Sequence, residues 1–82
     1  MTTIQISIQS YKDIQDFTKI ISNYTNDFDL VQGRYIVNAK STMGILSLDI
    51  SKPLFLNIRD AGSMINQILA DLSPFTMNNI EE

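Results

Sequence analysis

The sequence of 82 residues contains no cysteine and no histidine. Without cysteine the chain can form neither a disulfide nor a thiolate metal site, which suits a reducing cytoplasm. Without histidine it lacks the imidazole group that serves most often as general base and metal ligand. Its three glycines are too dispersed for a phosphate-binding loop. These absences remove the usual groups of an active site, so we expect no enzymatic activity, no cofactor and no metal site.

Basic residues are also scarce. The sequence has six Lys and Arg residues and nine Asp and Glu residues, which gives a formal net charge of −3. Neutralising about six to ten phosphates would require most of these scattered cations on one face, so nucleic-acid binding is disfavoured. No apolar run approaches the roughly 20 residues of a membrane span, and the N-terminus lacks the charged-then-apolar pattern of a secretion signal. We expect a soluble, cytoplasmic protein that binds neither nucleic acid nor membrane.

Hydrophobic periodicity indicates where strands and helices begin and end. Residues 3–9 alternate strictly between polar residues and isoleucine, which is typical of a half-buried strand. Ser10 followed by Asp13 resembles a capping box and begins an amphipathic helix of about three turns. Gly33 favours a hairpin turn. Further strands are predicted over 27–32, 35–39 and 54–59, and a short helix over 41–48. A second long helix is predicted over 64–72, with Met64 packed into the core of the protein.

The resulting order is β-α-β-β-α-β-α. Strands with one polar face and helices able to cover the other predict an α+β open-faced sandwich, with a four-stranded antiparallel sheet, two long helices and one short helix. We expect a single domain over 1–82, with its core in about 3–73 and a loose tail over 74–82, from which Phe75 or Met77 could return to the core. Asp27 and Asp29 are expected to form a solvated strand face that discourages edge pairing.

Ser41 stands where the third strand leaves the sheet and the short helix begins. A serine there can cap the helix by accepting a backbone N–H, and a helix start also tolerates an added negative charge. Met43 and Leu46, three residues apart, add a small apolar patch beside the hydroxyl. Two interpretations follow. The stretch is either a capped connector that packs Ile45 and Leu48 into the core, or a modification and binding site.

The stretch Asn38–Leu48 resembles the regulatory-serine segment of the HPr family, the small phosphocarriers of the sugar phosphotransferase system. The family pattern is asparagine, an apolar residue, lysine, serine, a variable residue, methionine-glycine and a run that ends in serine-leucine. This chain has Asn-Ala-Lys-Ser-Thr-Met-Gly-Ile-Leu-Ser-Leu at these positions. The fold of the family has the element order predicted above, so the resemblance extends over about residues 3–73.

The resemblance also shows what is missing. HPr carries its phosphoryl group on a histidine at the start of the first helix, and an arginine two residues later helps to hold the phosphate. Aligned from Ser41, the histidine position falls on Ser10, or on Gln9 with a one-residue slip. The arginine position falls on Lys12, and the following proline position on Asp13. A serine hydroxyl without a positioned base is a weak nucleophile. We therefore expect ordinary phosphocarrier activity to be absent.

At Ser41 the family pattern is intact. In the family this serine is phosphorylated by a dedicated kinase, and the phosphorylated form binds a transcriptional regulator of catabolite repression. The resemblance thus implies phosphorylation at Ser41 and partner contacts at Lys40, Thr42, Met43 and Leu46. Thr42 departs from the usual isoleucine or leucine, and Asp49 replaces what is commonly a glycine.

The function that we expect is a regulatory or binding module that acts through Ser41 phosphorylation and the adjacent apolar patch, as in the catabolite-repression relative of HPr that also lacks the histidine. Its partners would be proteins, namely an HPr serine kinase and a regulator. Two alternatives remain open. One is an HPr-fold interaction domain without phosphorylation, and the other is a phosphoryl acceptor that uses Ser10.

Overall fold

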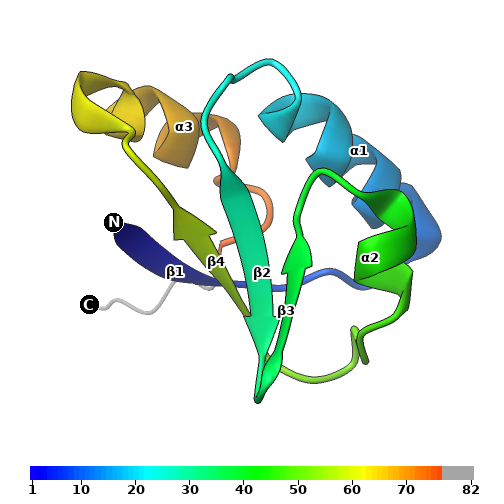
Figure 1. The fold of residues 1–82 in the computed structure, drawn as a ribbon. Coiled ribbons are helices and arrows are strands. Elements are labelled where there is room, and N and C mark those ends of the chain that lie inside the picture. The colour runs from blue at the N-terminus through cyan, green and yellow to red at the C-terminus, as the bar shows by residue number, and fades with distance from the viewer. Residues whose placement is uncertain (77–82) are drawn as a thin grey trace, which may run out of the picture.

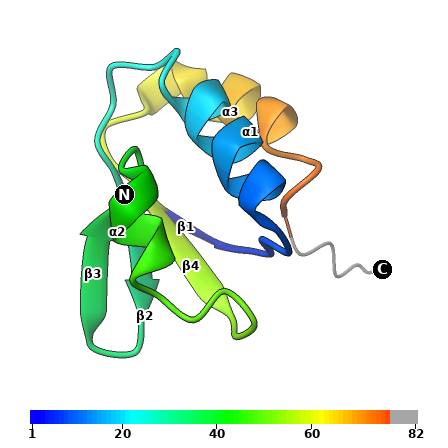
Figure 2. The ribbon, with the colours of Figure 1, turned by 90° about the vertical axis from the view of Figure 1, so that its right-hand side faces the viewer.

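The structure is a computed structural model that describes residues 1–76. These residues form one antiparallel sheet and a layer of helices. The sheet has the strand order β1-β4-β2-β3 and consists of β1 (Thr2–Ile6), β2 (Phe28–Gln32), β3 (Tyr35–Asn38) and β4 (Leu54–Ile58). The helices are α1 (Tyr11–Ile21), α2 (Thr42–Leu46) and α3 (Ile65–Asp71), which is preceded by a 3₁₀ turn, η1 (Gly62–Met64). All of them lie on one face of the sheet, and the other face is open (Figures 1 and 2). The predicted order and the open-faced architecture are confirmed.

The core lies between the sheet and the helices. Alternate residues of each strand point into it, and α1 adds three buried side chains from one stripe. Each large apolar side chain that is fully buried contributes about 1.5–3 kcal/mol, so this layer supplies most of the stabilisation. The principal core residues are Ile6, Phe28, Leu30, Leu54, Leu56 and Ile58 from the strands, and Ile14, Phe17 and Ile21 from α1.

Local signals in the sequence fix where α1 and the β2–β3 hairpin begin and end. The Ser10 hydroxyl accepts a hydrogen bond from the Asp13 amide at 3.1 Å, and the Asp13 carboxylate accepts one from the Gln9 amide at 3.0 Å. The Ser10 half of the expected capping box is therefore present, while the Asp13 carboxylate binds the amide of Gln9, the residue before the cap, instead of the Ser10 amide. Gly33, with φ of 60°, occupies the first central position of the two-residue hairpin turn. None of the helices within residues 1–76 has both the length and the apolar character that a bilayer crossing requires.

The first strand is shorter than the alternation predicts. β1 and its pairing with β4 end at Ile6, and the amide of the next residue, Ser7, donates to the Phe75 carbonyl at 2.8 Å on the outer side of the strand. Ile8 is nevertheless buried. The alternation therefore identified the buried face correctly but not the end of the pairing.

The core continues beyond residue 73, where we expected the tail to begin. Phe75 is only 7% exposed and meets the Phe17 ring edge to face, with 5.8 Å between the ring centroids. Thr76 then forms an antiparallel bridge with Ile6. Met77 lies outside the described residues. Met64, expected in the core, is 45% exposed because it belongs to η1 rather than to the apolar stripe of α3.

Candidate functional site

Ser41 lies in the connection between β3 and α2. Its backbone is extended, with φ of −98° and ψ of 113°, and its hydroxyl accepts a hydrogen bond from the Gly44 amide at 3.0 Å. The Ser41 amide donates to the Asn38 carbonyl, also at 3.0 Å. Ser41 is therefore the N-cap of α2. The side chain is partly exposed.

Two apolar side chains of α2 face solvent beside this serine. Met43 is 77% exposed and Leu46 is 48% exposed, while Ile45 is fully buried and anchors the helix. Residues three apart on a helix are neighbours on its surface. The structure thus brings Ser41, Met43 and Leu46 together on one short element, as the sequence predicts. We call Met43 and Leu46 the α2 patch.

The Lys40 side chain points away from the α2 patch, toward the end of α1. Its ammonium donates to the Tyr24 carbonyl at 2.6 Å, just beyond the C-terminal end of α1, and lies 5.5 Å from the centroid of the Phe28 ring. The charge therefore ties the β3–α2 connection to the end of α1. Although Lys40 is adjacent to Ser41 in sequence, its charged group is engaged away from the α2 patch. Thr42 is partly buried at the first position of the helix.

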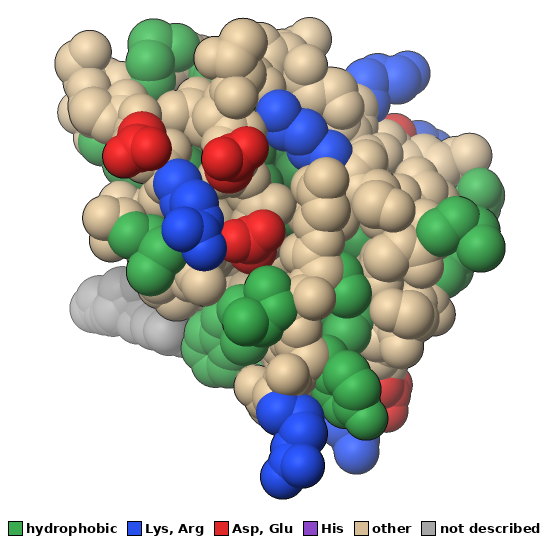
Figure 3. Space-filling view, in the orientation of Figure 1, with side chains coloured by type: hydrophobic (Ala, Val, Ile, Leu, Met, Phe, Trp, Pro, Cys, Tyr) green, Lys and Arg blue, Asp and Glu red, His purple; other side chains and the backbone are tan. Residues whose placement is uncertain are grey.

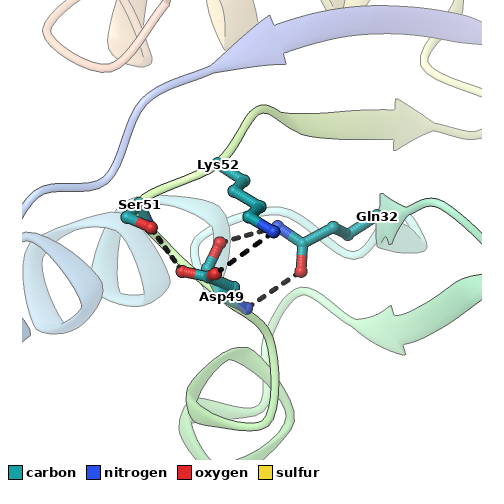
Figure 4. Close-up of polar contacts among 4 residues, drawn as sticks. All are labelled: Gln32, Asp49, Ser51 and Lys52. Carbon is teal, nitrogen blue, oxygen red and sulfur yellow. Dashed lines mark hydrogen bonds and ion pairs between the residues drawn. The ribbon is translucent and has the colours of Figure 1, made fainter.

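The segment after α2 is held by Asp49 and Gln32. The Gln32 side-chain amide donates to the Asp49 carbonyl at 2.6 Å and accepts from the Asp49 amide at 2.9 Å, which fixes the loop against the end of β2 (Figure 4). The Asp49 carboxylate accepts bonds from the Ser51 hydroxyl and amide at 2.5 and 3.1 Å. These two donors, together with Lys52 at 3.9 Å, lower the pKa of Asp49. The Asp49 side chain thus has a structural role in this loop.

The start of α1 presents a more closed arrangement. The Ser10 hydroxyl accepts from the Asp13 amide, and the Asp13 carboxylate accepts from the Gln9 amide. The Lys12 ammonium pairs with Asp16 at 3.0 Å. The Lys12 ammonium is therefore engaged with Asp16 and not with the Ser10 hydroxyl. The arrangement contains a carboxylate where an incoming phosphate would need cations. It is the geometry of a helix cap.

A shallow hollow of about 330 Å³ lies on the open side of the molecule, and sequence analysis did not identify it. Arg59 pairs with Asp29 there at 3.0 Å, and Figure 3 shows acidic side chains around one basic side chain in this region. The hollow is lined by Asp27, Phe28, Asp29, Asn38, Lys40 and Arg59. β2 lies between β4 and β3, so Asp27 and Asp29 do not protect a sheet edge as we expected. Within residues 1–76 no three acidic side chains are grouped as metal ligands would be.

Comparison with known proteins gives one result on the fold. No family model matches the chain, and neither does any curated protein. Among solved structures, the chain is similar to the crystal structure of HPr-C-His from Thermoanaerobacter tengcongensis, with a TM-score of 0.71 and 26% sequence identity. The alignment covers 88% of this chain and 90% of that chain. The fold is therefore HPr-like, in agreement with the resemblance carried by Asn38–Leu48.

Proposed function

We propose that this chain is a non-catalytic regulatory module with an HPr-like fold, switched by phosphorylation of Ser41. A serine kinase that acts on HPr would add the phosphate. A transcriptional regulator of the catabolite-repression type would bind the product through the phosphate and the α2 patch. The HPr-like fold and the sequence pattern around Ser41 support this proposal.

The observation that carries the proposal is the combination of a partly exposed hydroxyl with the α2 patch on one short helix. A phosphoserine brings a charge of about −1.5 to −2 and three acceptor oxygens. The first turn of α2 contains no acidic residue that would repel this charge. Beside it, Met43 and Leu46 offer an apolar contact that is already exposed. A partner would thus meet a charge and a hydrophobic surface together.

Ser10 is the matched comparison, because it also caps a helix with its hydroxyl. Its first turn already contains Asp13, whose carboxylate accepts the Gln9 amide. A phosphate on Ser10 would be placed close to this carboxylate, and the like charges would repel each other. The absence of histidine removes the group that carries phosphate in HPr. We therefore assign the switch to Ser41 and a capping role to Ser10.

The test is the intact mass of the full chain after incubation with ATP and an HPr serine kinase. Wild type and Ser10→Ala should each gain one phosphate of about 80 Da. Ser41→Ala should gain none. An HPr that carries the serine, incubated in parallel, verifies that the kinase is active. Unmodified wild type beside a modified HPr would refute the proposal, as would phosphate that persists in Ser41→Ala.

The partner half of the proposal has its own test. The phosphorylated protein should bind the regulator, and Met43→Ala combined with Leu46→Ala should weaken binding about tenfold, because the α2 patch is lost. Met64→Ala is the matched control, since Met64 is also exposed but lies in η1. Equal loss in the control would place the contact elsewhere.

A further inference from the structure

The two edges of the sheet are protected to different degrees. At the β1 edge, the Ser7 amide donates to the Phe75 carbonyl and Thr76 forms a bridge with Ile6. The segment after α3 therefore covers the end of this edge. β3 is the other edge of the sheet, and no strand of the described residues pairs with its outer side; α2 packs against β3 from the helix side (Figure 2). The strand reads Tyr-Ile-Val-Asn. It contains no proline or charged residue, the usual means by which an edge strand avoids pairing with another chain.

The side chains of β3 are also unusually apolar for their exposure. Tyr35 and Ile36 are each 66% exposed. On the open face of the sheet, the strand register aligns Ile36 with Val31 and Val31 with Phe55, which is 40% exposed. These three side chains form an apolar row that ends at the free edge. Figure 3 shows hydrophobic side chains gathered over the lower parts of these strands.

We propose that the β3 edge pairs antiparallel with the β3 edge of a second copy of this chain, with Ile36 opposite Ile36 across a two-fold axis. Paired residues must share a face of the sheet, so the register is limited to pairs of equal parity. Pairing at Ile36 joins the two rows into one continuous row of Phe55, Val31 and Ile36 from each copy. Pairing at Val37 would instead place Ile36 opposite Asn38.

The backbone of β3 is arranged for this register. Gln32 and Tyr35 close a two-residue hairpin, and in such a hairpin the closing pair is hydrogen-bonded. Hydrogen-bonded and non-bonded pairs then alternate along the ladder, so Ile36, which pairs with Val31, is a non-bonded residue. Its N–H and C=O therefore point to the free edge. Opposite a second Ile36 they can form two inter-chain hydrogen bonds.

Charge at the ends of the strand is compatible with the same register. Arg34 would lie opposite Asn38 of the second copy, which pairs with Asp29 at the rim of the hollow. Within residues 1–76 neither Arg34 nor Asp27 takes part in an ion pair. The guanidinium of one copy would thus approach the acidic side of the hollow of the other, once on each side of the axis. A four-residue strand provides a small interface, so the dimer should be weak and depend on concentration.

The chain has no cysteine, so a single introduced cysteine reports on this contact directly. Residues directly opposite in an antiparallel pair have Cα atoms about 4.5–5.5 Å apart, within the range of about 4.4–6.8 Å for a disulfide. Under mild oxidation, Ile36→Cys should form covalent dimers at least about tenfold faster than Tyr35→Cys, since the proposed register offsets the two Tyr35 residues by two positions along the strand. The two sites are equally exposed, which makes Tyr35→Cys the matched control.

Sedimentation equilibrium of the unmodified full chain completes the test. The apparent mass should rise toward that of a dimer between about 10 μM and about 1 mM. Ile36→Lys should abolish the rise, because it places two like charges opposite each other, and Met64→Lys should leave it unchanged. A monomer throughout this range, equal cross-linking of the two cysteine variants, or association that survives Ile36→Lys would each overturn the proposal. If Ile36→Lys fails to fold, the cysteine pair still decides.

Discussion

The two serine-capped helix starts differ in the residue three positions after the cap. Ser10 is followed at this position by Asp13, whose amide binds the serine and whose carboxylate binds back to Gln9. Ser41 is followed by Gly44, which offers an amide to the serine but no side chain. One start is therefore a reciprocal, closed cap, and the other is capped from one side only.

Packing explains why glycine suits position 44. A Cβ atom added there would lie 3.3 Å from the Val37 Cβ and 3.4 Å from the Ser41 side chain, closer than most real contacts. Glycine thus allows α2 to approach β3. As a consequence the first turn of α2 lacks an acidic group, whereas that of α1 contains one. The same residue that fits the helix to the sheet leaves Ser41 open to an added negative charge.

The largest effect in this comparison should come from the anchors of the two helices. Ile45 is the only residue within α2 that is buried, whereas α1 buries Ile14, Phe17 and Ile21. Ile45→Ala and Ile14→Ala should each lower the free energy of unfolding by about 3 kcal/mol, because each leaves a cavity. Only Ile45→Ala should also increase hydrogen exchange at the Gly44 amide selectively. Urea denaturation and amide exchange measure both effects.

Equal exchange at Gly44 in the two variants would show that α2 does not depend on its own anchor. In that case the β3–α2 connection, with Lys40 bound to Tyr24, would be sufficient to hold Ser41 in place.

Removal of the serine caps should have the next largest effect on the free energy of unfolding. Ser41→Ala should cost about 1–2 kcal/mol and Ser10→Ala about 0.5–1 kcal/mol. The difference is expected because the Ser41–Gly44 bond is partly buried and the Ser10–Asp13 bond is exposed, so water can replace only the latter well. Urea denaturation at neutral pH provides the comparison. Ser41→Asn and Ser10→Asn should stay closer to wild type, and an equal cost of the two alanine variants would contradict the difference in burial.

Substitution of Gly44, the residue that distinguishes the two helix starts, should change the free energy of unfolding less. Gly44→Ala gains about 1 kcal/mol of helix propensity but brings a Cβ close to Val37, so its net change should be within about 1 kcal/mol of zero. Gly44→Asp adds the same Cβ and also the carboxylate that α1 has. Phosphate incorporation by the HPr serine kinase should fall in Gly44→Asp and persist in Gly44→Ala. Equal incorporation would show that the acidic group does not decide between the two serines.

Sequence predicted the parts of this molecule that depend on near neighbours. Periodicity gave the element order, because each strand and helix buries one face. The caps at Ser10 and Ser41 were predicted correctly, because the acceptor and the amide are three residues apart. The exposure of Met43 and Leu46 agrees with the predicted patch for the same reason.

Contacts between distant residues could not be predicted in this way. The Lys40 ammonium binds the Tyr24 carbonyl, and Arg59 pairs with Asp29, although neither pair produces a period in the sequence. Asp29 lies on an interior strand because β2 pairs with both β3 and β4, and this strand order is not the order along the chain. The return of Phe75 to the core was anticipated, but not its partner, the Phe17 ring of the first helix. Each of these depends on topology rather than on local pattern.

The smallest expected effect concerns the far end of α2, where Asp49 holds the following loop. Donation by the Ser51 hydroxyl and amide keeps the pKa of Asp49 below its ordinary 3.8. The stability from this carboxylate should therefore be complete above that value and be lost as the pH falls through the lower folded-state pKa. The effect is small because the side chain is 51% exposed.

Asp49→Asn should accordingly lower the urea midpoint at about pH 6, and the difference from wild type should shrink as the pH approaches about 2. Ser51→Ala should reduce the same acid dependence, since it removes the hydroxyl donor but leaves the amide. A difference that stays constant with pH would mean that Asp49 acts through its backbone bonds to Gln32 alone. Confirmation would sharpen the contrast between the two ends of α2. After the C-terminal end, an ionised carboxylate would fix the loop. The N-terminal turn contains no acidic group and so accommodates a phosphate.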